Sequence, residues 1–552
     1  MIHSLWTLAA DTASSGSSGT ARIPAPHIEY AQLSPMLIVF GAALAGVLAE
    51  AFVPRRARRT TQLVIALAGL AAAFGAVVAL AAEGYATGKA HLAAMGAVAV
   101  DGPSLFLQGV ILLVSVLAVL QFAERRLEPH GPADQPVDAF APQAAAVPGS
   151  DAEKAAGRAG FATTEVYPLS LFSIGGMLLF PAASDLLTMF VALEVLSLPL
   201  YLLCALARRR RVLSQEAAVK YFLLGAFSSA FFLFGLALLY GYAGTVSLGG
   251  IADVVSGNAP VTPALANTTA NDALLLIGLA MIGVGLFFKI GAAPFHSWTP
   301  DVYQGAPTPV TGFMAAATKV AAFGAVLRLL YVAFPGMQWD WRPVLWGVAI
   351  LTMAVGAIIA ITQTDVKRML AYSSIAHAGF LLTGVIAGNG KGIAAVLFYL
   401  AAYAFVTMGA FAVVTLVRDA GGEATHLSRW AGLGRRSPLL AAIFAIFLLS
   451  FAGIPLTAGF SGKFAVFQAA ASGGAVPLVI IGVLSSAVAA FFYIRVIVLM
   501  FFSEPRPDGP TVAVPSVFTA TAIGVGALVT VVLGIAPQYF LHLADTAGLF
   551  VR

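Results

Sequence analysis

The sequence predicts an all-α polytopic membrane protein with about 14 transmembrane helices. Of its 552 residues, 60% are hydrophobic and only 10% are charged, whereas charged residues make up about 25% of ordinary soluble domains. The mean hydropathy of the whole chain is +0.91, and continuously apolar runs of helix length, such as residues 105–122, recur along it. The strands of a transmembrane β-barrel would instead alternate apolar and polar residues, so we expect helices throughout.

Apolar runs of about 20 residues, the length that crosses a bilayer, give the expected helices in chain order. They lie at residues 33–53, 62–82, 103–123, 166–184, 186–207, 215–241, 273–294, 308–333, 344–363, 366–387, 391–417, 437–470, 476–502 and 514–535. Residues 1–32 hold a Ser- and Gly-rich stretch and no basic leader, which predicts an N-terminal extension rather than a cleaved signal peptide. The Pro- and Ala-rich residues 124–165 predict a disordered cytoplasmic loop.

The placement of lysine and arginine predicts the orientation, because the cytoplasmic loops of polytopic proteins carry the positive excess. Loops on one side of the alternating helices hold 19 of these residues: Arg55, Arg56, Arg58, Arg59, Arg125, Arg126, Lys154, Arg158, Arg208, Arg209, Arg210, Arg211, Lys367, Arg368, Arg418, Arg429, Arg435, Arg436 and Arg506. The other side holds five: Arg22, Lys89, Arg342, Lys391 and Arg552. We therefore expect both termini on the outer side of the membrane.

Composition excludes several kinds of chemistry and one class of partner. The single cysteine, Cys204, lies inside an apolar run, so thiolate zinc sites, iron–sulfur clusters and disulfides within the chain are not expected. The formal net charge is +5, but the basic residues occupy short loops between apolar runs, where topology signals belong. We therefore expect a lipid bilayer, and no nucleic acid, around this chain.

Ionisable side chains inside the expected helices are the candidates for function. Each costs roughly 2.5–3.5 kcal/mol near the middle of a bilayer, so they need partners, water or both. Glu194 lies near the middle of its run and is too short to reach the surface; its alternative role is a packed ion pair. Lys220 follows Arg211 by only nine residues, so it can reach the cytoplasmic face and is equally consistent with a surface lysine.

Two lysines lie beside expected helix breaks. Lys289 precedes Gly291 and Pro294, and the same device recurs about 170 residues later, where Lys463 follows Gly453 and Pro455. An interrupted helix frees carbonyl groups that favour a cation or an ordered water, although a proline kink with an incidental charge is the alternative. Matching interruptions in two halves of a chain predict inverted repeats.

The expected organisation follows from these repeats. We expect two five-helix repeats, at residues 166–333 and 344–502, each with one broken helix. Three helices in residues 33–123 precede them, and residues 514–552 hold the last helix and the C-terminus.

Lys319 and His377 complete the candidate set. Lys319 lies about eleven residues into its run, and His377 shares a helical face with Ser373 and Ser374, which makes a polar stripe suited to water. A hydrogen-bonded core histidine is the alternative. A carboxylate beside lysines that gain and lose protons is the composition that a proton relay needs, so we expect Glu194, Lys220, Lys289, Lys319, His377 and Lys463 to form one.

Residues 289–310, which read KIGAAPFHSWTPDVYQGAPTPV, resemble the signature of the antiporter-like subunits of bacterial NADH:quinone oxidoreductase, respiratory complex I, a family related to Mrp antiporters. Residues 193–201, 363–377 and 452–464 fit the same family, and the similarity covers at least residues 166–502. The motifs PDVYQGAP and LEVLSLP are typical of the subunit N branch of this family.

This resemblance implies a role for each candidate residue. Glu194, Lys220, Lys289, Lys319 and Lys463 match the family's glutamate and lysines of the fifth, sixth, seventh, eighth and twelfth helices, and with His377 they would form a hydrated polar axis. The resemblance implies a proton-translocating subunit in the bacterial plasma membrane, bound to other membrane-arm subunits. It implies no cofactor in this chain; NADH, FMN, iron–sulfur clusters and a quinone would be used by the rest of the complex.

Two other functions remain open. A subunit of a multisubunit cation/proton antiporter shares the fold and needs no NADH, and its companions would be small antiporter subunits. The third function is a scaffold that only holds a membrane arm together. In that case the complex would keep pumping protons after Lys289→Ala.

Overall fold

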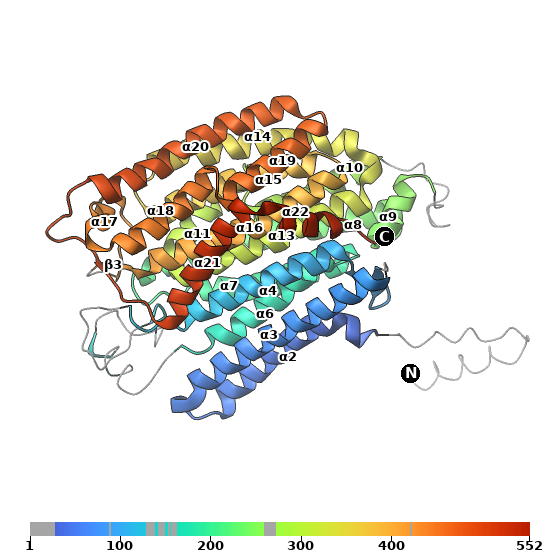
Figure 1. The fold of residues 1–552 in the computed structure, drawn as a ribbon. Coiled ribbons are helices and arrows are strands. Elements are labelled where there is room, and N and C mark those ends of the chain that lie inside the picture. Colours follow the sequence, from blue (N-terminus) through green and yellow to red (C-terminus); the bar gives the residue numbers. More distant parts are fainter. Residues whose placement is uncertain are drawn as a thin grey trace, which may run out of the picture.

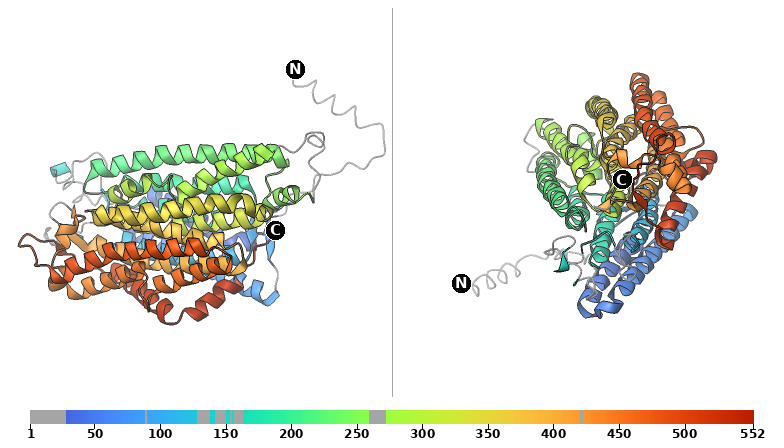
Figure 2. Two further views of the ribbon diagram at one scale, coloured as in Figure 1. Left: turned by 90° about the horizontal axis from the view of Figure 1, so that it is seen from above. Right: turned by 90° about the vertical axis from the view of Figure 1, so that its left-hand side faces the viewer.

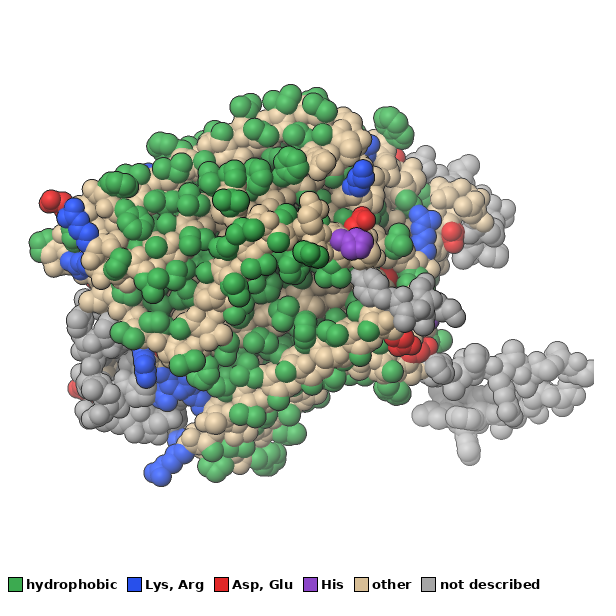
Figure 3. All heavy atoms as spheres, viewed as in Figure 1, with side chains coloured by type: hydrophobic (Ala, Val, Ile, Leu, Met, Phe, Trp, Pro, Cys, Tyr) green, Lys and Arg blue, Asp and Glu red, His purple; other side chains and the backbone are tan. Residues whose placement is uncertain are grey.

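Long helices that alternate in direction make up the computed structural model, which describes residues 28–87, 90–127, 138–141, 150–152, 155, 163–258, 272–419 and 422–552 (Figure 1). Within these residues, twelve helices are long and apolar enough to span a membrane, and two shorter apolar helices, Val166–Ala182 and Pro438–Ala452, accompany them. The predicted all-α polytopic fold is therefore confirmed, and its helices follow the expected apolar runs. Hydrophobic side chains cover the middle of the face seen in Figure 3, and charged ones gather at its two ends.

The first crossings are α2 (Tyr30–Phe52), α3 (Arg55–Thr87) and α4 (Gly102–Phe122). Five further crossings follow as α6 (Val166–Leu179), α7 (Leu186–Cys204), α8 (Arg211–Ala243), α10 (Asp272–Ile290) with α11 (Trp298–Gly305), and α12 (Thr308–Phe313) with α13 (Lys319–Arg328). The next five are α14 (Gln338–Thr362), α15 (Val366–Ile386), α16 (Gly390–Leu416), α18 (Pro438–Ala452) with α19 (Ala458–Ser472), and α20 (Val476–Phe502). The last crossing is α21 (Val517–Ile535), and the short helices are α9 (Leu248–Val255), α17 (Leu433–Arg436) and α22 (Pro537–Thr546).

Short strands close the two ends of the bundle. An antiparallel hairpin pairs β1 (His91–Ala93) with β2 (Val98–Val100). At the end where α3 begins and α4 ends, which we call the basic end, β3 (Val417–Asp419) lies between β4 (Gly422–Glu423) and β5 (Thr511–Val512). The sequence predicts 19 lysines and arginines on one side of the membrane. Those that the structure describes lie in loops and at helix ends at the basic end. The sequence did not predict these strands, which have only two or three residues each.

The helices α15, which carries His377, and α16 lie in the interior of the bundle. Nearly every residue of α15 and α16 is buried, whereas the long helix α20 exposes leucine, valine, isoleucine and phenylalanine side chains, as a lipid-facing helix does. In the end-on view of Figure 2, α2 and α3 form one edge of the bundle. Close packing of α14 on α15 depends on Gly356, where a Cβ atom would come within 2.4 Å of the Ala376 nitrogen, next to His377.

Two predicted segments lie mostly outside the described residues. Of the N-terminal extension, only residues 28–32 are described, and α2 begins at Tyr30, three residues earlier than the apolar run suggested. Of the loop at 124–165, Phe140 is buried and pairs with Ala207, and Asp138 forms an ion pair of 3.9 Å with Arg208. The Glu124 carboxylate accepts hydrogen bonds from the nitrogen and hydroxyl of Ser516.

A buried ion cluster at the basic end fixes the link between α11 and α12. The Glu423 carboxylate lies 3.2 Å from Lys367 Nζ and accepts a hydrogen bond of 3.2 Å from the Thr308 nitrogen. Lys367 also donates to the Ala306 carbonyl at 2.6 Å. Burial alone would raise the pKa of Glu423, but the charges of Lys367 and Arg418 and the hydrogen bonds from Thr308 lower it from 4.5 to about 2.

This pKa predicts that Glu423→Gln destabilises the protein in a pH-dependent way. A carboxyl with a pKa near 4.5 unfolded and about 2 folded contributes about 3 kcal/mol above pH 4.5, and the contribution is lost as the pH falls toward 2. The thermal stability of the parent and the variant should therefore converge as the pH is lowered from about 7 to about 3. Glu504→Gln, at an exposed position of the same end, serves as the control; a gap that stays constant with pH would contradict the assignment.

Candidate functional site

Lys289 lies where the seventh apolar run breaks. The helix α10 ends at Ile290, Gly291 follows with φ of +74°, and the chain becomes helical again at Trp298. The Phe288 carbonyl at this break accepts two hydrogen bonds, from the Gly291 nitrogen at 3.0 Å and from the indole nitrogen of Trp298 at 2.9 Å. The Lys289 side chain is buried and donates from Nζ to the hydroxyls of Ser197 at 2.8 Å and Tyr221 at 3.1 Å.

Glu194 lies one helical turn before Ser197 on α7. Its Oε1 atom is buried and has no hydrogen-bond partner among the described residues. Glu194 is close enough to Lys289 for their charges to interact. The Ser197 hydroxyl, which also donates to the Leu193 carbonyl, therefore stands beside the carboxylate and in contact with the amine.

Lys319 lies at the start of α13, directly after the π-helical segment Met314–Thr318. Single π-helical turns inside α-helices frequently mark functional sites. The buried Lys319 amine donates to both the carbonyl and the hydroxyl of Ser374, the latter at 2.7 Å, and lies 5.2 Å from the centre of the Tyr403 ring. A cation over an aromatic ring gains electrostatic stabilisation that is larger when both are desolvated.

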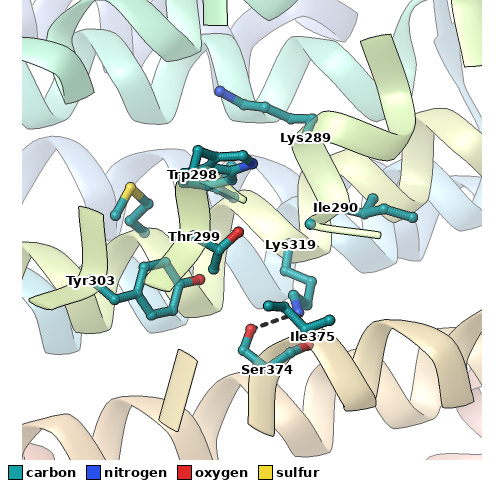
Figure 4. A pocket seen from close by; sticks show the side chains of 11 residues that line it. Lys289, Ile290, Trp298, Thr299, Tyr303, Lys319, Ser374 and Ile375 are labelled. Atoms are coloured by element: carbon teal, nitrogen blue, oxygen red, sulfur yellow. Dashed lines mark hydrogen bonds between the residues drawn. The ribbon is translucent and has the colours of Figure 1, made fainter. Parts of the chain in front are cut away.

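One cavity connects the surroundings of Lys289 and Lys319. Both lysines line it, together with Trp298, Thr299 and Tyr303. In Figure 4 the amine of Lys319 points to Ser374, whereas the amine of Lys289 points away from it. The cavity offers about 10 Å³ to the centre of a water molecule, which is about the space that one water needs.

His377 is held between two tyrosines from other helices. Its Nδ1 atom lies 2.6 Å from the Tyr399 hydroxyl of α16, and its Nε2 atom lies 3.4 Å from the Tyr493 hydroxyl of α20. Tyr493 in turn is hydrogen-bonded to Ser373, one turn before His377 on α15. The predicted stripe of Ser373, Ser374 and His377 is therefore buried, and hydroxyl groups from two other helices meet it.

Lys463 lies at the second helix break. The helix α18 ends at Ala452, Gly453 follows with φ of +83°, and α19 begins at Ala458, so Pro455 lies in the interruption. The Lys463 amine donates to the carbonyls of Phe451 at 2.8 Å and Ala452 at 3.1 Å, and to the Ser486 hydroxyl at 2.8 Å. Here a lysine side chain satisfies carbonyls at the end of the broken helix.

Gly453→Ala is expected to displace Lys463 and to destabilise the second break. An added Cβ would lie 3.0 Å from Lys463 Cδ, and the φ of +83° is unfavourable for alanine. The left-handed backbone alone costs about 1–2 kcal/mol. The variant should lower the thermal stability of the purified protein and reduce its activity, whereas Gly347→Ala, where an added Cβ meets nothing within 4 Å, should do neither. Unchanged stability of Gly453→Ala would contradict this geometry.

Lys220 does not join the buried set. Its side chain is 42% exposed near the basic end and forms ion pairs with Asp301 at 2.7 Å and Glu216 at 2.6 Å. Asp301 also pairs with Arg368 at 2.6 Å. The structure therefore places the Lys220 side chain at the surface near the basic end. This agrees with the expectation that a lysine nine residues from Arg211 can reach the surface.

Several polar residues of the site carried no separate signal in the sequence. Ser197, Tyr221, Tyr399, Tyr403, Tyr493 and Ser486 surround the four buried ionisable side chains. Each lies in an apolar run where a lone hydroxyl is unremarkable. Only a three-dimensional arrangement can reveal that they converge on the lysines and the histidine.

Comparisons with known proteins agree with this arrangement. The transmembrane family model described as NADH:quinone oxidoreductase/Mrp antiporter matches residues 183–489. The chain is similar to NADH-quinone oxidoreductase subunit N 3 of Streptomyces griseus subsp. griseus, with 70% identity over 100% of this chain and 99% of that protein.

Two solved structures have the same fold. A chain of respiratory complex I from Thermus thermophilus is 34% identical, with coverage of 93% of this chain and 99% of that chain and a TM-score of 0.71. A chain of the Mrp complex from Dietzia sp. DQ12-45-1b is 22% identical, with coverage of 94% and 97% and a TM-score of 0.76, which shows likeness of fold alone. With the family model matched over more than half of its residues and a relative 70% identical along its full length, the chain belongs to the NADH:quinone oxidoreductase/Mrp antiporter family.

Proposed function

We propose that this chain is the proton-translocating, antiporter-like membrane-arm subunit N of an NADH:quinone oxidoreductase. The observation that carries the proposal is the series of buried ionisable groups Lys289, Lys319, His377 and Lys463, each held by hydroxyl or carbonyl partners inside the bundle. Charged groups are costly in a bilayer, and in membrane proteins they mark ion and proton pathways. Because the chain is 70% identical to a subunit N, we infer that such a pathway works in an NADH-quinone oxidoreductase.

The chemistry that these residues support is the loading and release of protons. A carboxylate close to an amine stabilises the protonated amine, so a change in the charge or position of Glu194 changes whether Lys289 holds its proton. We propose that Lys289 is loaded from the basic end, where Lys220 and Asp301 lie. The proton would pass to Lys319 through the cavity that both lysines line, continue to His377 and leave near Lys463.

Orientation and internal symmetry complete the proposal. We infer that the basic end faces the cytoplasm, because cytoplasmic loops carry the positive excess, and both termini then lie outside the bacterial plasma membrane. We also infer two inverted repeats at residues 166–333 and 344–502, since α6 starts at the basic end and α14 at the opposite end, and each set contains one broken helix.

The partners follow from the same proposal. The other membrane-arm subunits would bind this chain within the bilayer. The redox groups of the complex, NADH, FMN, iron–sulfur clusters and a quinone, would be bound by other subunits, and electron transfer there would drive proton movement here. The family also contains antiporter subunits, but the likeness to the Mrp complex, at 22% identity, extends only to the fold.

Purification of the native complex through a tag on this chain tests the proposal. We expect flavin- and iron–sulfur-containing subunits among the companions, and NADH-driven quinone reduction in the preparation. Small antiporter subunits without flavin would instead assign the chain to a multisubunit cation/proton antiporter and would refute the proposal.

A further inference from the structure

Buried hydroxyl groups around His377 lie between the surroundings of two of the buried lysines. On one side, the Lys319 amine contacts Ser374, and the neighbouring Ser373 is hydrogen-bonded to the Tyr493 hydroxyl. Tyr493 then lies 3.4 Å from Nε2 of His377. Ser373, Ser374, His377 and Tyr493 are all buried.

The other side of His377 leads toward Lys463. Nδ1 of His377 lies 2.6 Å from the Tyr399 hydroxyl. The Tyr399 ring packs against Gly462, where an added Cβ would lie 2.6 Å from Tyr399 Cδ2, and Gly462 directly precedes Lys463. The Phe380 ring contacts both His377, at 5.7 Å between ring centres, and the Lys463 amine, at 4.8 Å. One nitrogen of the imidazole thus faces Tyr493, which bonds the serine next to the Ser374 partner of Lys319. The other nitrogen faces Tyr399, whose ring packs on the residue before Lys463.

We infer that Tyr493 and Tyr399 are proton-transferring residues on either side of His377, and that they carry the proton between Lys319 and Lys463. The inference rests on the proposed proton-relay function and adds two residues to it. A hydroxyl group donates one hydrogen bond and accepts others, so it can receive a proton from one neighbour while it gives its own to the next. Neutral histidine has one donor and one acceptor nitrogen, which suits it to the centre of such a chain.

The transfer balances in protons and charge. Tyr493 gives its hydroxyl proton to Nε2 of His377 and regains one from Ser373. The protonated amine of Lys319 gives up one proton, which refills the Ser373 hydroxyl through Ser374 and water, and the amine is left neutral. The imidazolium that forms releases its Nδ1 proton to the Tyr399 oxygen. Tyr399 passes its own hydroxyl proton to the neutral amine of Lys463, directly or through water. One proton has then moved, His377 is neutral again, and exchange of its tautomer resets the chain.

Tyr493→Phe and Tyr399→Phe test this inference in the assembled complex, because phenylalanine keeps each ring and removes only the hydroxyl. We expect each to lower proton translocation per electron by about tenfold or more, since positioned proton-transfer groups contribute roughly 10²–10⁴-fold. The solvent deuterium isotope effect on translocation should rise, which a loss of packing alone would not cause. Tyr331→Phe is the matched control, because its hydroxyl donates to a backbone carbonyl, that of Val385 on α15, at 2.9 Å.

Parental translocation in both phenylalanine variants, in a complex that Lys289→Ala inactivates, would overturn the inference and leave the proposed function standing. Parental translocation in Lys289→Ala would instead refute the proposed function itself. If either phenylalanine variant fails to assemble, Ser373→Ala, which removes the hydroxyl that supplies Tyr493, decides by the same measurement: a loss supports the chain and parental translocation overturns it.

Discussion

Lys289→Ala is expected to reduce proton translocation and coupled quinone reduction by the assembled complex by at least about tenfold, because a positioned proton-transfer group typically contributes 10²–10⁴-fold. The variant removes the buried amine that contacts Ser197 and Tyr221 and senses the charge of Glu194. Proton uptake by vesicles that hold the purified complex, measured together with NADH oxidation, reports both effects.

Two further variants make this test specific. Glu194→Gln keeps the shape of the side chain and removes its charge, so it should also depress translocation while the complex assembles. Lys391→Ala removes an exposed lysine at the start of α16 and should leave translocation unchanged. If Lys289→Ala and Glu194→Gln both assemble and pump at the parental rate, the relay assignment is wrong and the scaffold interpretation gains support.

Loss of the Asp101–Arg328 pair should cause the largest decrease in stability. The Arg328 side chain is completely buried, and its Nη2 atom lies 2.7 and 2.8 Å from the two Asp101 oxygens. Arg328 also donates to the Pro181 carbonyl at 2.6 Å, and the Val551 nitrogen donates to Asp101 at 3.0 Å. The pair thus ties α13, the start of α4 and the C-terminal residues together.

Either Asp101→Leu or Arg328→Met leaves one buried charge without its partner, which costs about 3–5 kcal/mol. Both single variants should markedly lower the temperature at which the complex loses this subunit. The double variant should be more stable than the sum of the two single effects predicts, because it buries no unpaired charge. Single variants as stable as the parent would contradict the structural role of the pair.

Features that depend on local composition could be predicted from the sequence. A lysine in an apolar run followed by Gly291 and Pro294 indicates a buried charge beside a broken helix, and the structure has one there. The ends of α20 coincide with those of its apolar run, because a bilayer-length hydrophobic stretch has few other ways to fold.

The partners of those charges could not be predicted, because they come from distant parts of the chain. Ser197 lies 92 residues before Lys289, and Asp101 lies 227 residues before Arg328. An apolar run does not show which of its faces meets another helix, so the sequence does not connect Arg328 with Asp101. Lys220 could equally have been buried or exposed, and its contacts with Glu216 and Asp301 place it near the surface.

The most direct test of the account is an experimental map of the native complex at a resolution that shows ordered water. We expect density for water in the cavity between Lys289 and Lys319, and unbroken polar contacts from there through His377 to Lys463. A map in which these side chains are dry, isolated from one another or turned toward lipid would contradict the claim that they carry protons through the membrane.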